Sequence, residues 1–89
     1  MQRIHLLILG DVTGVGFRSW TLRQARGLGL TGWVKNVSKG VVEVLAEGEK
    51  ESLEEFIKRC HHGPDVAWVE KVEVKWGEAT GEFTGFGIR

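Results

Sequence analysis

The sequence has little of several features that mark whole classes of protein. Cys60 is the only cysteine among 89 residues, so no internal disulfide bond and no cluster of thiolate metal ligands can form. Lys plus Arg and Asp plus Glu number 12 each, and a net charge of zero does not favour a general nucleic-acid or membrane binder. No apolar run approaches the roughly 20 residues of a membrane span, and residues 4–9 are too short for a signal-peptide core. We therefore expect a cytoplasmic protein.

Apolar residues make up 42% of the chain and are spread along its length. A chain of this size buries about 60–65% of its extended surface on folding, which is enough for one core. No linker and no low-complexity segment interrupts the pattern. We expect a single domain spanning residues 1–89 that acts as a monomer.

Hydrophobic periodicity predicts the secondary structure. Apolar residues at helical spacing define two helices, one with Phe17, Leu22, Ala25 and Leu28, the other with Leu53, Phe56, Ile57 and Cys60. On the strand after the second helix, the pattern places Trp68, Val72, Val74 and Trp76 on one side. The expected elements are a strand at 4–9, a helix from 17 or 18 to 28, strands at 32–37 and 41–46, a helix at 50–62, a strand at 68–76 and a short last strand including Phe83, Phe86 and Ile88.

This β-α-β-β-α-β order predicts an α+β fold, the ferredoxin-like sandwich, in which an antiparallel sheet carries both helices on one face. Ile4, Leu6 and Ile8 would then pack with Val42 and Val44 beneath the helices. The four tryptophans are expected in the core or on the face of the sheet, and Cys60 as a small buried apolar residue.

The stretch GDVTGVGFRSW, residues 10–20, fits two interpretations, a plain glycine turn before a helix and an anion site. Gly14 and Gly16 can adopt positive φ at no steric cost, so successive N–H groups can point into one concavity just before a helix N-terminus. Arg18 in the first helical turn opposes the helix dipole, and a bound anion would relieve that conflict. A right-handed crossover returns the second strand to the same end of the sheet, which brings Asn36 level with Arg18. The stretch is neither a nucleotide P-loop nor a dinucleotide fingerprint, because it lacks their Lys and glycine positions.

The same stretch resembles the signature of the acylphosphatase family. The resemblance covers essentially the whole chain at the expected spacing, in the motifs GDVTGVGFR at 10–18, LGLTGWVKN at 28–36, KGVVE at 39–43, Gly63-Pro64 with Ala67 and Val69, and Phe83 with FGIR at 86–89. One departure is Thr13, where the family usually has glutamine. Because phosphate binding would use the loop backbone, we expect this replacement to have a small effect on it, with any shift falling on substrate preference.

The resemblance implies a ferredoxin-like enzyme that hydrolyses acyl phosphates to a carboxylate and inorganic phosphate. By motif position, Arg18 would bind the phosphoryl group and Asn36 would orient the attacking water. The small-molecule acyl phosphate is the expected partner, and neither a cofactor nor a metal is expected. The backbone expected to bind the phosphate belongs to Thr13, Gly14, Val15, Gly16, Phe17 and Arg18.

Three other interpretations stay open at this point. The first is a non-catalytic phosphate-binding or regulatory domain on the same fold. The second is an RNA-recognition motif, which shares the element order, but the chain follows Lys39-Gly40 with valines where that motif carries stacking aromatics. The third is a metal site at His5, His61 or His62, although adjacent helical residues do not share a face.

Overall fold

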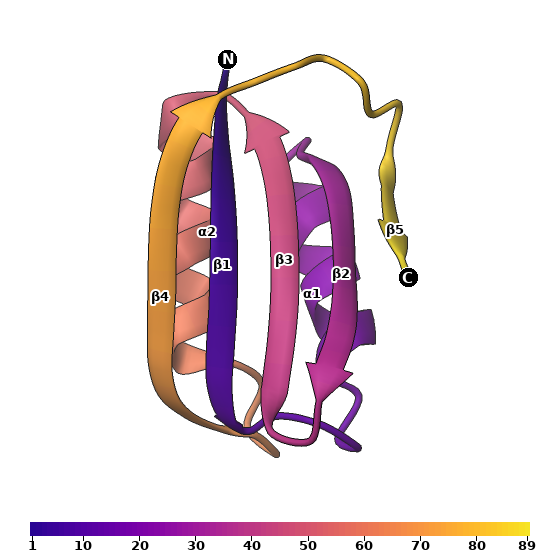
Figure 1. Ribbon diagram of the computed structural model, residues 1–89, viewed down its shortest axis with the longest axis vertical. Coiled ribbons are helices and arrows are strands. Elements are labelled where there is room, and N and C mark those ends of the chain that lie inside the picture. The colour runs from indigo at the N-terminus through magenta and orange to yellow at the C-terminus, as the bar shows by residue number, and fades with distance from the viewer.

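The computed structural model describes residues 1–89, and Figure 1 shows a sheet with both helices behind it. The elements are β1 (Gln2–Asp11), α1 (Phe17–Gly27), β2 (Thr31–Ser38), β3 (Val41–Gly48), α2 (Lys50–His62), β4 (Trp68–Glu78) and β5 (Phe86–Ile88). The predicted helices and strands are all present, with ends within a few residues of those expected. Neither helix combines the length and apolar character needed to cross a bilayer.

The sheet has the order β4-β1-β3-β2-β5. The central β1–β3 pair and the flanking β1–β4 and β2–β3 pairs are antiparallel, which confirms the ferredoxin-like fold. The added fifth strand runs parallel to β2, so the sheet as a whole is mixed. In Figure 1 the connection from β4 crosses the upper end of the sheet to reach β5 at the opposite edge.

The core lies between the sheet and the helices. Ile4, Leu6 and Ile8 are fully buried against Val42 and Val44, as predicted. From the helices come the buried residues Phe17, Thr21, Ala25, Leu53, Phe56 and Cys60. Each large apolar side chain among these stabilises the fold by about 1.5–3 kcal/mol before entropy is subtracted. The Thr21 hydroxyl, which the apolar pattern does not reveal, donates a hydrogen bond to the Phe17 carbonyl at 2.8 Å.

The chain leaves α1 at Gly29, directly after the predicted helix end at residue 28. Gly29 has φ 72°, and its N–H donates to the Arg26 carbonyl while the Leu30 N–H donates to the Ala25 carbonyl. This pair of bonds satisfies carbonyls that the helix leaves free, and it turns the chain into β2.

The prediction for the face of β4 is wrong at Trp68. The register against β1 shifts between Leu9 and Gly10, so Gly10 pairs with Val69 whereas Ile8 pairs with Val72. This bulge puts Val69 in phase with Val72 on the helix side and turns Trp68 away, leaving it 69% exposed.

The remaining aromatic residues give one further correction, at Phe83, while the tryptophans lie against the core or on strands of the sheet, as expected. None of the four tryptophans is buried, and those outside β4 are half-buried, Trp20 against the core and Trp33 beneath the Arg89 guanidinium at 4.8 Å from its ring centroid. Phe83 belongs to the β4–β5 connection rather than to the last strand, and it lies beside the Arg3 guanidinium.

Candidate active site

The glycine-rich loop and the end of β2 lie at one edge of the molecule. Because β1 and β2 both pair antiparallel with β3, they run in the same direction and end at the same edge. The loop leaves β1 there and leads directly into α1, at the lower end of Figure 1. Asn36 is therefore level with Arg18, as the crossover argument predicts.

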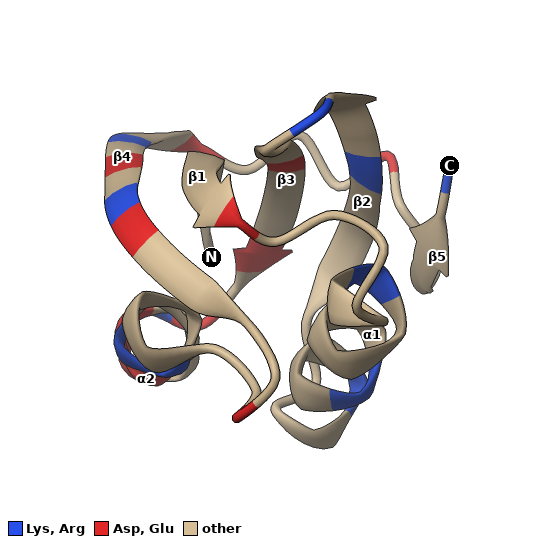
Figure 2. Cartoon of the chain, turned by 90° about the horizontal axis from the view of Figure 1, so that it is seen from below, with Lys and Arg blue, Asp and Glu red and all other residues tan.

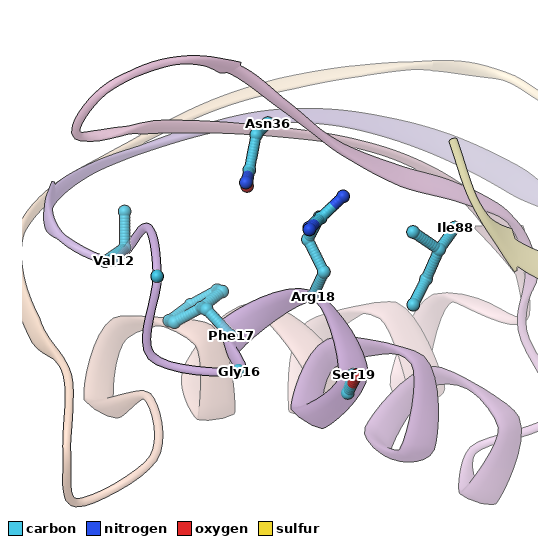
Figure 3. Close-up of a pocket in the computed structure, with 8 residues that line it drawn as sticks. Val12, Gly16, Phe17, Arg18, Ser19, Asn36 and Ile88 are labelled. Atoms are coloured by element: carbon cyan, nitrogen blue, oxygen red, sulfur yellow. The ribbon is translucent and has the colours of Figure 1, made fainter.

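A cavity of about 150 Å³ opens between the loop, the first turn of α1 and β2. Figure 3 shows the Arg18 side chain rising from α1 and the Asn36 side chain descending from β2 toward the same space. The lining residues are Val12, Gly14, Gly16, Phe17, Arg18, Ser19, Asn36 and Ile88.

The backbone N–H groups of the loop have no hydrogen-bond acceptor within the protein. Gly14 and Gly16 both have φ 76°, the left-handed conformation expected of them, and Gly16 is the N-cap of α1. None of the N–H groups from Thr13 to Ser19 donates a hydrogen bond to a protein acceptor. The loop and the helix N-terminus thus present a set of free donors beside the cavity, which is the arrangement that binds anions.

Arg18 adds a positive charge that nothing in the chain neutralises. Its exposed side chain makes no ion pair and no hydrogen bond within the protein. The first turn of α1 contains no acidic residue. In Figure 2, which views the molecule from the loop edge, α1 carries only blue bands, whereas α2 and β4 carry both charges. The helix dipole and the guanidinium together favour an anion in the cavity.

Asn36 faces the cavity because of its place in the strand. It pairs with Val42 and shares a side of β2 with Val34, both of which are buried beneath the helices. Asn36 lies beyond that cover and is exposed, and its amide makes no hydrogen bond within the protein. Both the amide N–H and the carbonyl oxygen are therefore available to a ligand or a water molecule.

Tertiary contacts hold the walls of the cavity. Phe17 is 1% exposed within the core shared by the sheet and both helices, and this burial fixes the start of α1. On the other side, β5 carries Ile88 to the cavity. The Arg26 guanidinium donates to the Phe86 carbonyl at 3.1 Å, and the Arg89 N–H donates to the Val34 carbonyl at 2.9 Å, so α1 and β2 both hold this strand.

Sequence reasoning placed Gly14, Gly16, Phe17, Arg18 and Asn36 at the site, and all five line the cavity. The predicted loop residues Thr13 and Val15 do not line it. The Thr13 hydroxyl instead accepts a hydrogen bond from the Gly40 N–H, and Val15 packs against the core.

Three lining residues escaped the sequence analysis. Val12 directly precedes and Ser19 directly follows the predicted site residues 13–18, and this adjacency could have indicated them. Ile88 reaches the cavity only because β5 pairs with β2, which no local pattern indicates.

The remaining reactive side chains lie elsewhere. His5 contacts Glu43, with 2.6 Å between Nε2 and the carboxylate; this hydrogen bond is the main cause of a lowered pKa at Glu43. Cys60 is buried, as predicted, and burial raises the pKa of its thiol to about 12. No group of three or more His, Cys, Asp or Glu side chains is arranged to hold a metal ion.

Fold and site together define a ferredoxin-like α+β protein with a cavity bordered by free N–H groups, an unpaired arginine and an unpaired asparagine. Comparison with known proteins identifies its family. The acylphosphatase family model matches residues 4–88. The chain is 51% identical to an acylphosphatase from Thermococcus kodakarensis, over 97% of this chain and 93% of that protein. It is 48% identical to an acylphosphatase from Salinibacter ruber, over 99% and 93% respectively.

A solved structure gives the same result. The crystal structure of acylphosphatase from Bacillus subtilis superposes with a TM-score of 0.95 at 32% identity, covering 100% of this chain and 99% of that one. The chain belongs to the acylphosphatase family. Its activity is accordingly the hydrolysis of acyl phosphates, and an acyl phosphate is its substrate.

Proposed function

We propose that the cavity is the catalytic centre, with the loop and Arg18 binding the phosphoryl group and Asn36 orienting the attacking water. The observation that carries this proposal is that the free N–H groups of the loop, the unpaired Arg18 guanidinium and the unpaired Asn36 amide all border one cavity. Three kinds of polar group left without partners at one place are what a ligand with many oxygens would satisfy.

The loop and Arg18 stabilise the charge of the transferring phosphoryl group. Backbone donors from Thr13 to Arg18 bind its oxygens without moving, since glycine φ values already orient them. The planar guanidinium of Arg18 matches two oxygens at once. An arginine on a transferring phosphoryl group is worth roughly 10³–10⁵ in rate.

Asn36 orients the attacking water. A neutral amide is not a base near pH 7, but it can hydrogen-bond a water and hold it in line with the bond to be broken. The water oxygen forms the new P–O bond while the bond to the acyl oxygen breaks. The proton of the water passes to an oxygen of the phosphoryl group.

The leaving group explains why the cavity needs no acid. It departs as a carboxylate with the bonding electron pair, and the conjugate acid of such a group has a pKa near 4. Departure therefore requires no proton. The lining residues include no Asp, Glu, His, Cys or Lys, which accords with this chemistry.

We also propose a domain extent, an oligomeric state and a cellular compartment for the protein. We infer one catalytic domain, residues 1–89, acting as a monomer in the cytoplasm. A buried free thiol at Cys60 accords with a reducing compartment. Sedimentation at micromolar concentration and fractionation of cells test the two statements, and a stable dimer or an extracellular location would contradict them.

The experiment measures turnover of benzoyl phosphate, with and without a chelator, for matched pairs of variants. Arg18→Gln should lose most kcat/KM, whereas Arg23→Gln makes the same charge change elsewhere on α1 and should retain it. Asn36→Ala should lose kcat, whereas Ser38→Ala, exposed at the end of the same strand, should not. A folded Asn36→Ala protein with normal kcat would refute the water role, and equal losses for Arg18→Gln and Arg23→Gln would refute the phosphoryl role.

A further inference from the structure

The Thr13 side chain joins the glycine-rich loop to the β2–β3 turn. Its hydroxyl oxygen accepts a hydrogen bond from the Gly40 N–H, with 3.2 Å between Oγ1 and N. The Gly40 carbonyl accepts a second bond, from the Gly10 N–H at 3.1 Å. The chain around the start of the loop therefore holds both backbone polar groups of Gly40.

The turn that carries Gly40 is also the end of the strand that carries Asn36. The regular ladder between β2 and β3 is interrupted there, because the register shifts between Asn36 and Ser38. A shifted register leaves fewer ladder bonds to define the end of a strand. Contacts from outside the hairpin consequently have more influence on where Asn36 sits.

We propose that the Thr13 hydroxyl is a positioning group, which sets the place of Asn36 relative to the phosphate-binding loop. This inference rests on the proposed function, in which the loop binds the phosphoryl group and Asn36 holds the water. The Thr13 side chain does not line the cavity, and its hydroxyl, which is bound to Gly40, touches neither reactant. It acts through the turn, by holding the two halves of the site in one arrangement.

Removal of the Thr13 hydroxyl should lower turnover without changing the affinity for phosphate. The Gly10–Gly40 bond remains, so the turn stays near its place. The loop N–H groups and Arg18 are unchanged, so affinity for inorganic phosphate stays the same. Alignment of the water with the phosphoryl group becomes looser, and small misplacements of reacting groups cost rate steeply. We expect kcat to fall about 3- to 10-fold, the range that one neutral hydrogen bond supports.

The test compares Thr13→Val, which has nearly the same shape without the hydroxyl, with Thr13→Ser, which keeps it. Benzoyl phosphate kinetics give kcat and KM, competition by inorganic phosphate gives its Ki, and thermal unfolding gives Tm. The expected result is a reduced kcat with an unchanged phosphate Ki in Thr13→Val, and recovery of most of the turnover in Thr13→Ser. If Thr13→Val does not fold, Thr13→Ala provides the same comparison.

Other outcomes distinguish a failure of the Thr13 inference from a failure of the proposed catalytic site. Normal kcat in Thr13→Val, assayed well below its Tm, overturns the inference and leaves the proposed function intact. Equal losses of kcat in Thr13→Val and Thr13→Ser also overturn it, because the hydroxyl is then irrelevant. A wild-type protein that binds phosphate without turning over benzoyl phosphate refutes the proposed function, and this inference with it.

Discussion

Glu47 offers the sharpest test of how the fold supports the site, because it is the one charged residue that is buried, at 2% exposure. Its carboxylate accepts hydrogen bonds from the Arg3 Nε at 2.7 Å, the Thr80 N–H at 2.9 Å, the Thr80 hydroxyl at 3.3 Å and the Gly81 N–H at 3.1 Å. These bonds attach the β4–β5 connection, seen crossing the sheet in Figure 1, to the end of β3. That connection leads to β5 and so to Ile88 at the cavity.

We expect Glu47→Gln to destabilise the protein by about 2–4 kcal/mol. Breaking a buried ion pair costs about 3–5 kcal/mol. The loss is smaller here because Arg3 is 24% exposed and keeps its ion pair with Glu82. A domain of this size has a total stability of about 4–13 kcal/mol, so the loss is a large share of it. At about 4–8 °C per kcal/mol, Tm should fall by roughly 8–32 °C.

The same carboxylate makes stability depend on pH. Burial by itself raises the pKa of Glu47, but the hydrogen bonds from Thr80, Arg3 and Gly81 outweigh it and hold the pKa below its usual value. In the unfolded chain the pKa returns to about 4.3. The stabilisation by Glu47 is therefore complete above about pH 4.3 and is lost as pH falls through the lower, folded pKa. The deficit of Glu47→Gln should shrink over that window.

Unfolding in guanidinium chloride, monitored by tryptophan fluorescence, measures the free energy of unfolding of wild type and Glu47→Gln at pH 7 and at about pH 3. Glu82→Gln is the matched control: Glu82 is 57% exposed and binds the same arginine, so its loss should stay below about 1 kcal/mol. Two results would refute the reasoning. One is an equal loss of stability in the two variants at pH 7, and the other is a Glu47→Gln deficit that does not change with pH.

Three further predictions concern single residues. Arg18→Lys keeps the charge but loses the planar pair of donors, so kcat/KM for benzoyl phosphate should fall about 10- to 100-fold. This loss should be smaller than that of Arg18→Gln. An equal loss would show that the charge of Lys contributes nothing. Gly16→Ala meets no atom within 4 Å but must adopt φ 76°, so denaturant titration should show a loss of about 1–2 kcal/mol, and no loss would contradict the strained conformation. The Cys60 thiol, with its pKa raised to about 12 by burial, should react with a disulfide reagent at pH 8 only after global unfolding, and rapid reaction of the native protein would contradict its burial.

The structure also shows why some expectations from sequence failed. Alternation along β4 predicts that Trp68 shares a face with Val72, but the phase of a strand changes at a bulge, and this bulge exists only in the pairing with β1. Phe83 follows the apolar spacing of a strand, yet the backbone beside it is attached to Glu47 through Thr80 and Gly81 and lies in the connection. In both places the deciding contact comes from residues far away in the chain.

The sequence by itself determined the order of the elements, the buried faces of both helices and the identity of the loop, because helical and strand periodicities and glycine conformations are local properties. It also determined that Arg18 and Asn36 lie at the same end of the sheet, because the crossover returns the second strand there. Only the tertiary structure decided that β5 lies parallel to β2 and brings Ile88 to the cavity, that Glu47 holds the preceding connection, and that the Thr13 hydroxyl binds Gly40. These contacts join residues that are 27 or more positions apart, and no periodic pattern encodes such pairings.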